Sequence, residues 1–270
     1  MIFIRIKIKI MLPQYLKPFE TNYENLIRLG NKFDGGYVID KRVIDKTETI
    51  IACGLNDEWS FEKAFQNKNK KCEIIAYDHT VDDEFWKNHL KQSLSKIFFL
   101  KEVNKKRFTK LFKIIDYYFF FKNKNKHFKK KIVKNSINKL SEISINEAIR
   151  DKHNVLLKID IEGDEYNILN DVDKNFDRLN LLIIEFHDLQ KNLIKIKEFL
   201  ENTQMKNIHI NANNYGMIDE TGIPQVIEMT LINPKKFEIK NKKVEWKYPL
   251  KGLDFKNRER GSEINIEFND

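Results

Sequence analysis

The run LLKIDIEGDEYNIL, from Leu156 to Leu169, joins an apolar stretch to an acidic turn with a single glycine. Its first half predicts a buried strand, because apolar residues follow one another almost without interruption. Asp160 would stand at the carboxyl end of this strand, and Gly163 would let the backbone turn sharply after it. Ligands bind at this end of the strands in open α/β sheets. Since unpaired buried carboxylates are costly, we expect Asp160, Glu162 and Glu165 to face a cleft, a metal or basic groups.

Apolar runs on both sides alternate with amphipathic stretches, which is typical of an α/β protein with a mostly parallel sheet. Seven strands are expected, over residues 49–54, 72–78, 96–101, 154–160, 179–186, 206–211 and 225–233. About a dozen residues separate the last two, which leaves little room for a helix crossover, so the final strand should run antiparallel. Residues 189–201 repeat apolar side chains at helical spacing and predict a helix that covers the sheet. Ser144 and Glu147 have the spacing of a capping box.

The stretch 102–138 interrupts this rhythm, because a connection between strands needs far fewer residues. We interpret it as a helical insertion between the third and fourth strands. Residues 101–134 hold 13 Lys or Arg against two acids, so they carry a net charge of +11, and the rest of the chain carries −2. A hairpin packed on the core, a contact with a partner, a second copy or a membrane surface, and a funnel for an anionic substrate all fit this segment. The confined charge argues against a general nucleic-acid binder.

The remaining bulk features bound the class of protein. Cys53 and Cys72 have no metal-ligand spacing and form no disulfide scaffold, so a reducing, cytoplasmic location is the simplest interpretation. No stretch has the roughly 20 apolar residues of a membrane span. Residues 4–10 alternate apolar and basic side chains, which predicts a strand with one wet face rather than a signal peptide. Translation from Met11 is the alternative. We divide the chain into an N-terminal segment, 1–48, and a main domain, 49–270.

Two positions near the first strands point to a nucleotide-like ligand. Gly54 follows the first strand, where the backbone must turn and a ligand can approach closely. Asp78 ends the second strand, where an acid can accept hydrogen bonds from a ribose diol. The pair implies an adenosine-containing ligand, but it does not choose between a dinucleotide and S-adenosylmethionine.

Several blocks together resemble the FkbM-type methyltransferases. They are RLGNKFDGGYVI (28–39), CGLNDEWSFEKAF (53–65), YDHT (77–80) and LLKIDIEGDEYNIL, with IPQVIEMTLIN and YPLKGLDFKN similar to the closing strand and tail. The resemblance spans residues 28 to about 257, and the insertion departs from it. It implies an α/β, Rossmann-like class I methyltransferase with a seven-stranded, mostly parallel sheet that uses S-adenosylmethionine.

The resemblance also implies where the cofactor lies. It places the methionine part at the loop after the first strand and the ribose at Asp78. A turn before the first strand would close over the cofactor, although it also fits a purely structural turn. The residues expected at the cofactor are Gly54, Asn56, Asp57, Ser60, Phe61, Asp78 and His79, together with Asp34, Gly35, Gly36 and Tyr37 of the turn.

Catalysis is expected at the ends of the fourth and fifth strands, with Asp160, Glu162, Glu185 and His187. A sugar hydroxyl is a poor acid, so its methylation needs a base or a divalent metal. His187 is the candidate base, because its ordinary pKa lies near neutrality. Asp160 and Glu185 are candidate oxygen ligands for Mg²⁺. Each of these residues also fits a plain orienting role.

The leading interpretation is an O-methyltransferase for a sugar, a nucleotide-linked sugar or a surface-glycan precursor of capsule or polysaccharide biosynthesis. Nucleic acid is an unexpected partner, and a homo-oligomer through the insertion fits the sequence. An RNA methyltransferase that uses the insertion and a non-catalytic binding protein on the same scaffold are the alternatives. A dehydrogenase fits less well, because the chain has no GxGxxG motif.

Overall fold

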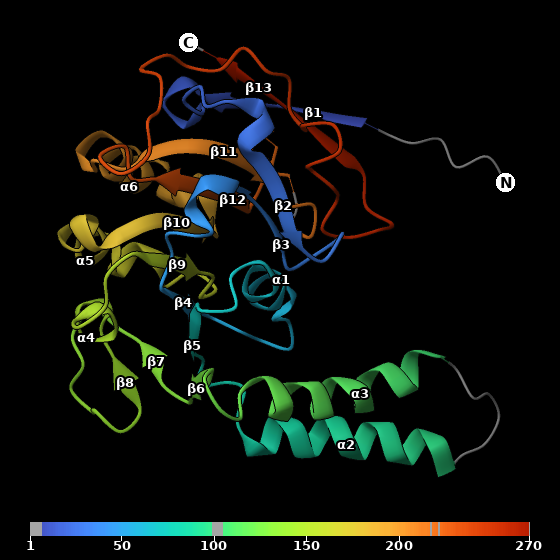
Figure 1. Cartoon of the computed structure of the whole chain (residues 1–270). Helices are drawn as coiled ribbons and strands as arrows, with labels where there is room; N and C mark the ends of the chain where they lie inside the picture. The colour runs from blue at the N-terminus through green and yellow to red at the C-terminus, as the bar shows by residue number, and fades with distance from the viewer. Residues whose placement is uncertain (1–6, 99–104, 217, 221, 270) are drawn as a thin grey trace, which may run out of the picture.

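The computed structural model describes residues 7–98, 105–216, 218–220 and 222–269, with the backbone alone at 7, 92–98 and 105–110. Seven strands form the central sheet in the order β11-β12-β10-β9-β4-β5-β6 (Figure 1). Their bounds are β4 (Thr49–Cys53), β5 (Glu73–Tyr77), β6 (Lys126–Phe128), β9 (Val155–Ile159), β10 (Leu179–Phe186), β11 (Lys206–Ala212) and β12 (Ile227–Ile232).

The sheet confirms the predicted Rossmann-like class. β10, β9, β4, β5 and β6 are parallel neighbours, whereas β12 runs antiparallel to both β10 and β11. Every residue of β4, β9 and β10 is buried. Such continuous burial is expected of parallel strands whose two faces are both covered. It explains why these strands could be predicted from apolar runs in the sequence.

The helices include α1 (Ser60–Lys68), α4 (Ile145–Ile149), α5 (Leu169–Lys174) and α6 (Leu189–Asn202). The expected helix at 189–201 is α6, which buries Leu189, Ile196 and Phe199. The capping box at the start of α4 is present, since Ser144 accepts a hydrogen bond from the Glu147 amide and Glu147 accepts one from the Ser144 amide. Short 3-10 helices are η1 (Gln14–Leu16), η2 (Tyr23–Asn25), η3 (Lys41–Val43), η4 (Glu165–Asn167) and η5 (Phe176–Arg178).

The N-terminal segment adds two small sheets. β1 (Lys7–Pro13) pairs in parallel with β13 (Glu263–Asn269), while residues 4–6 lie outside the described chain. Ile10 and Leu12 of β1 are buried, so the residues just before Met11 belong to the fold. β2 (Leu26–Gly30) and β3 (Gly36–Asp40) form a hairpin that packs on α1.

A further small sheet lies in the middle of the chain, where β7 (Lys131–Ile132) and β8 (Glu142–Ile143) form a short parallel pair.

The insertion is helical, but its expected place was wrong. α2 (Asp83–Phe98) and α3 (Lys105–Phe120) form a hairpin that extends from the sheet edge (Figure 1). It therefore lies between the second strand, β5, and the third, β6, rather than after the third. The strand expected at 96–101 is the end of α2 as far as residue 98, and residues 99–101 lie outside the described chain. A short apolar run such as KIFFLK fits a helix as well as a strand.

No described helix has the length and apolar character needed to span a bilayer.

Candidate active site

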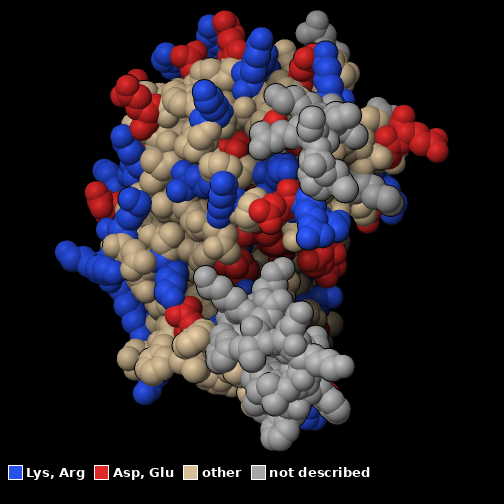
Figure 2. All heavy atoms as spheres, turned by 90° about the vertical axis from the view of Figure 1, so that its right-hand side faces the viewer, with Lys and Arg blue, Asp and Glu red and all other residues tan. Residues whose placement is uncertain are grey.

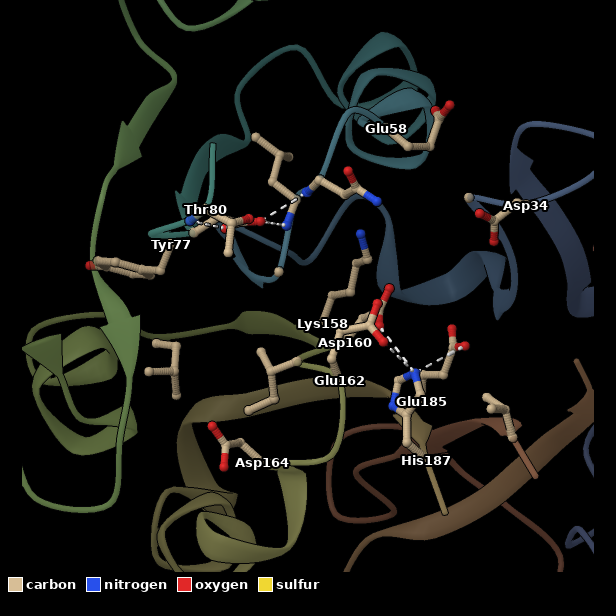
Figure 3. Close-up of a pocket in the computed structure, with 18 of the residues that line it drawn as sticks. Asp34, Glu58, Tyr77, Thr80, Lys158, Asp160, Glu162, Asp164, Glu185 and His187 are labelled. Atoms are coloured by element: carbon tan, nitrogen blue, oxygen red, sulfur yellow. Dashed lines mark hydrogen bonds and ion pairs between the residues drawn. The ribbon is translucent and has the colours of Figure 1, made fainter. Parts of the chain in front are cut away.

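A cavity of about 770 Å³ opens at the carboxyl ends of β4, β5, β9 and β10 (Figure 3). Its volume lies within the range of small-molecule sites in proteins. Most of the residues expected from the sequence line it, namely Asp34, Gly35, Tyr37, Gly54, Asn56, Asp57, Asp78, His79, Asp160, Glu162, Glu185 and His187. Gly36, Ser60 and Phe61 do not line it.

Ser60 and Phe61 instead build the wall behind the turn between β2 and β3. The Ser60 hydroxyl accepts a hydrogen bond from the Asn31 amide (2.9 Å) and donates one to the Gly35 carbonyl (3.3 Å). Phe61 is 1% exposed and packs edge-on against Tyr37, with ring centroids 5.4 Å apart. These contacts hold the turn at the start of α1, so both residues act on the cavity through its shape.

Gly54 allows the ends of β4 and β9 to touch. Its φ is +85°, and a Cβ added there would lie 1.7 Å from the carbonyl oxygen of Asp160. The Asp160 amide donates to the Cys53 carbonyl (2.8 Å) directly beside it. Only glycine combines this backbone conformation with this contact. The following loop, residues 54–58, is called the cofactor loop below.

Asp78 holds the cofactor loop in place through hydrogen bonds. One carboxylate oxygen accepts hydrogen bonds from the amides of Leu55 (2.8 Å) and Asn56 (2.9 Å), and the other accepts from the amide and hydroxyl of Thr80 (2.8 and 2.6 Å). Burial opposes ionisation of Asp78, but these bonds outweigh it and lower its pKa. The carboxylate is thus ionised and engaged within the chain, and the expected contact with ribose stays a prediction.

The insertion braces the same loop, which the sequence did not indicate. Lys113 of α3 lies 3.2 Å from a carboxylate oxygen of Asp57 and 3.7 Å from one of Glu58. The indole N–H of Trp59 donates to Asp116 of α3 (3.0 Å). The segment that departs from the family resemblance therefore forms part of the support of the site.

His187 lines the cavity and is paired with the buried Glu165 behind it. Nδ1 of His187 lies 2.7 Å from a carboxylate oxygen of Glu165, which is fully buried and also accepts from the Gly163 amide (3.1 Å). In the neutral ring, a carboxylate partner places the proton on Nδ1, which leaves the lone pair on Nε2. Nε2 lies 3.5 to 3.9 Å from carboxylate oxygens of Glu162, Glu185 and Asp160 (Figure 3).

Glu165 is a further candidate site residue that the sequence did not single out for a role. It was recognised only as an acid of the turn, and its partner lies 22 residues away, at the end of the next strand. The signal was the last acid of the KIDIEGDE run together with the histidine of IIEFHD. Burial lowers the pKa of His187, but the hydrogen bond and charge of Glu165 outweigh it, and the pKa of His187 is raised.

Three carboxyl groups in this part of the structure have raised pKa values. Burial raises the pKa of Asp160 above its usual value and that of Glu228 to about 7. Glu185 faces Glu228 across β10 and β12, and burial together with the charges of Asp160 and Glu228 holds its pKa well above the usual range. Lys158 points toward the cavity, but its Nζ is paired with the buried Glu62 at 3.1 Å.

The lining of the cavity is consequently acidic. Its described carboxylates are Asp34, Asp57, Glu58, Asp78, Asp160, Glu162, Asp164 and Glu185, against Lys130, Lys131 and Lys158. Acidic side chains also gather in the middle of the face that Figure 2 presents, whereas lysines are spread over its rest. A cavity with this sign of charge attracts a positively charged ligand.

The cofactor-free protein should lose stability as the pH rises from about 5 to about 8, because its raised pKa values belong to the folded state. Asp160, Glu185 and Glu228 contribute stability that is present below the ordinary carboxyl pKa and lost as the pH passes their raised values. The pKa of His187 is also raised, so its contribution to stability is likewise lost as the pH rises through that value. Burial lowers the pKa of His127, so its contribution instead increases as the pH rises toward about 6.5. Urea unfolding at a series of pH values measures the free energy of unfolding. A free energy of unfolding that rises between about pH 5 and about pH 8 would contradict this prediction.

Comparison with known proteins gives a family match for the part of the chain that contains β9, β10 and His187. A family model described as "Methyltransferase FkbM domain" matches residues 120–208, which include β9, the acidic turn, β10 and His187. The match to this family model covers about a third of the chain. The chain is an S-adenosylmethionine-dependent methyltransferase, as its sequence predicted.

Solved structures of similar fold are distant. Precorrin-6y C5,15-methyltransferase from Geobacter metallireducens GS-15 is 16% identical, with a TM-score of 0.35 over 71% of this chain and 87% of that one. The TYW2 protein of M. jannaschii in complex with AdoMet is 12% identical (TM-score 0.31, 79% and 89% covered). The Methanococcus jannaschii fibrillarin pre-rRNA processing protein is 10% identical (0.33, 70% and 67%). Likeness at this level says nothing about the substrate, and no curated protein matches the chain.

The residues present fit S-adenosylmethionine. The cofactor carries a sulfonium and an ammonium group, which suit a cavity lined mostly by carboxylates. The absent side chain at Gly54 leaves room beside the end of β9. Asn56, with a φ of 48°, and Glu162, with a φ of 56°, hold left-handed backbone conformations at the same edge. Such conformations in residues other than glycine concentrate at binding sites.

Proposed function

We propose that this FkbM-family enzyme methylates a sugar hydroxyl, carried on a nucleotide or on a surface-glycan precursor. The observation that supports this is the pair of His187 and Glu165, with Nε2 of His187 turned toward the cavity. A hydroxyl acceptor must lose its proton during transfer, so it needs such a base, whereas an acceptor with a free lone pair and no proton to lose does not.

When bound in this cavity, S-adenosylmethionine would supply an electrophilic methyl group. Nε2 of His187 accepts the hydroxyl proton, and the buried carboxylate of Glu165 stabilises the imidazolium that forms. Glu185 is held by a hydrogen bond from Asn213 (2.9 Å), and with Asp160 it orients the acceptor hydroxyl groups. These groups are fixed before the acceptor binds, which favours a productive alignment.

The preference for a nucleotide-linked sugar rests on the rim of the cavity. Lys130 and Lys131 line it, and both follow the helical hairpin in the chain. Lys131 is paired with Asp164 at 2.8 Å at a half-exposed position. A pyrophosphate at this rim would find positive charge there, while the sugar reaches the acidic floor.

Incubation with isotope-labelled S-adenosylmethionine and a panel of nucleotide sugars tests this function. Mass spectrometry should detect the gain of one methyl group, and hydrolysis of the product should leave the label on the sugar. The same sugars without the nucleotide are the matched controls for the rim. Transfer to RNA but to no sugar would replace this function by the RNA methyltransferase alternative.

A divalent cation is the second candidate, favoured by one observation. Asp160, Glu185 and His187 each offer a ligand atom, and these atoms lie within 4.8 Å of one another. Mg²⁺ prefers oxygen ligands, whereas an imidazole in the set favours a transition metal such as Mn²⁺. A cation there would occupy Nε2 of His187, so the base and metal roles exclude each other.

Chelation separates these two roles. If His187 is the base, dialysis against EDTA should leave the rate of methyl transfer within about twofold of the untreated enzyme, since removing an essential metal ordinarily removes far more. Elemental analysis of the purified protein is the parallel control. A loss of about tenfold or more that Mn²⁺ or Mg²⁺ restores would transfer the role to a metal.

A further inference from the structure

The outer side of α3 exposes a stripe of large apolar side chains. Phe112, Ile115, Tyr118 and Phe119 are 65, 52, 53 and 73% exposed. Their spacing places them on one side of the helix, and we call them the outer stripe. A helix of a water-soluble domain ordinarily turns its apolar side to the core. A continuous exposed apolar side of this kind marks an interaction surface.

The opposite side of α3 already holds the hairpin in place. Tyr117 is buried and packs against Trp86 of α2 and Trp59 beside the cofactor loop, with ring centroids 4.6 and 5.7 Å apart. Asp116 accepts a hydrogen bond from Trp59 (3.0 Å) and pairs with Lys63 of α1. Within the outer stripe, Tyr118 packs edge-on against Tyr117, with ring centroids 5.2 Å apart. Phe112, Ile115 and Phe119 take no part in the contacts described above, so attachment of the hairpin to the sheet does not explain their exposure.

The charge of this segment indicates which kind of partner binds the outer stripe. α3 contains five Lys or Arg and one Asp, and residues 101–134 as a whole carry a net charge of +11. A second copy of this chain would bring two such segments together, and their like charges would repel. An anionic bilayer attracts them instead, and it offers an apolar layer just beneath its charged surface. Ile115 lacks the aromatic ring on which a nucleic-acid base would stack.

We propose that the outer stripe docks this enzyme on an anionic membrane surface. Phe112, Ile115 and Phe119 enter the boundary between headgroups and acyl chains. Basic residues of the segment meet the lipid phosphates, except those paired at the cavity, such as Lys113 and Lys131. Docking of this kind is compatible with any of the acceptors considered above.

Sedimentation of the full-length protein with vesicles tests the proposal. Vesicles of phosphatidylcholine with phosphatidylglycerol should bind the protein, and vesicles of phosphatidylcholine alone should bind at least about tenfold less, because the attraction depends on anionic lipid. Raising the salt concentration to about 0.5 M should weaken binding, since salt screens charges near a surface. The variant Phe112→Ser/Ile115→Ser/Phe119→Ser should lose about tenfold or more in vesicle affinity while it binds S-adenosylmethionine normally, which shows that it is folded.

The matched control changes apolar residues that are even more exposed but lie off the stripe. Ile137 and Leu140, 91 and 89% exposed, follow β7 just after the basic segment, and Ile137→Ser/Leu140→Ser should bind vesicles like the unchanged protein. Absence of binding to anionic vesicles at low salt overturns the proposal. So does a triple variant that binds as well as the unchanged protein. A dimer detected by light scattering, or RNA binding, that the triple variant abolishes without any vesicle binding would assign the stripe to that partner instead.

Discussion

Replacing His187 by Gln should lower the rate of methyl transfer by about 10²–10⁴-fold, the usual contribution of a general base. Gln keeps a polar side chain of similar reach but cannot accept and carry a proton at neutral pH. The affinity for S-adenosylmethionine should change little, because the proton is taken from the acceptor rather than from the cofactor. Single-turnover rates with labelled cofactor, together with calorimetric binding, separate the two effects.

Two comparisons make this test specific. Glu165→Gln removes the negative charge that raises the pKa of His187, so its rate should rise with pH at a lower pH than in the unchanged enzyme. His79 lines the same cavity without contacting this pair, and His79→Gln should reduce the rate far less. A His187→Gln enzyme that retains a rate close to the original would remove the base from the mechanism.

The sequence was sufficient to predict the buried centre of the fold. β4, β9 and β10 are covered on both faces, so nearly every residue in them is apolar, and the run is visible without any knowledge of its neighbours. The edge strand β6 gave no such signal. It has three residues, KHF, two of them exposed, and it pairs with β5 on one side only.

The chemistry of the site was predictable only in part, because its partners meet through the tertiary fold. Asp160 and His187 were found from their places at strand ends. The bond between Glu165 and His187 depends on how the turn after β9 packs against the end of β10. The cross-strand contact of Glu185 with Glu228 depends on the antiparallel register of β12, which no local pattern encodes.

Replacing Gly54 by Ala should have the second large effect, on both stability and cofactor affinity. An alanine Cβ at this position would lie 1.7 Å from the carbonyl oxygen of Asp160, and a backbone atom cannot rotate away as a side chain can. The ends of β4 and β9 must therefore separate, which moves Asp160 and the cofactor loop. We expect S-adenosylmethionine affinity to fall by about 10–100-fold, equivalent to about 1.4–2.8 kcal/mol, and the unfolding midpoint to fall as well.

Gly252 offers the matched control for this prediction. Its φ is +83°, nearly that of Gly54 at +85°, but a Cβ there would meet no atom within 4 Å. Gly252→Ala therefore carries only the cost of a left-handed backbone, about 1–2 kcal/mol, and should leave cofactor affinity unchanged. The difference between the two variants in urea unfolding and in calorimetric binding isolates the contact with Asp160. Equal losses of stability with normal cofactor binding in both would show that the junction of β4 and β9 does not shape the site.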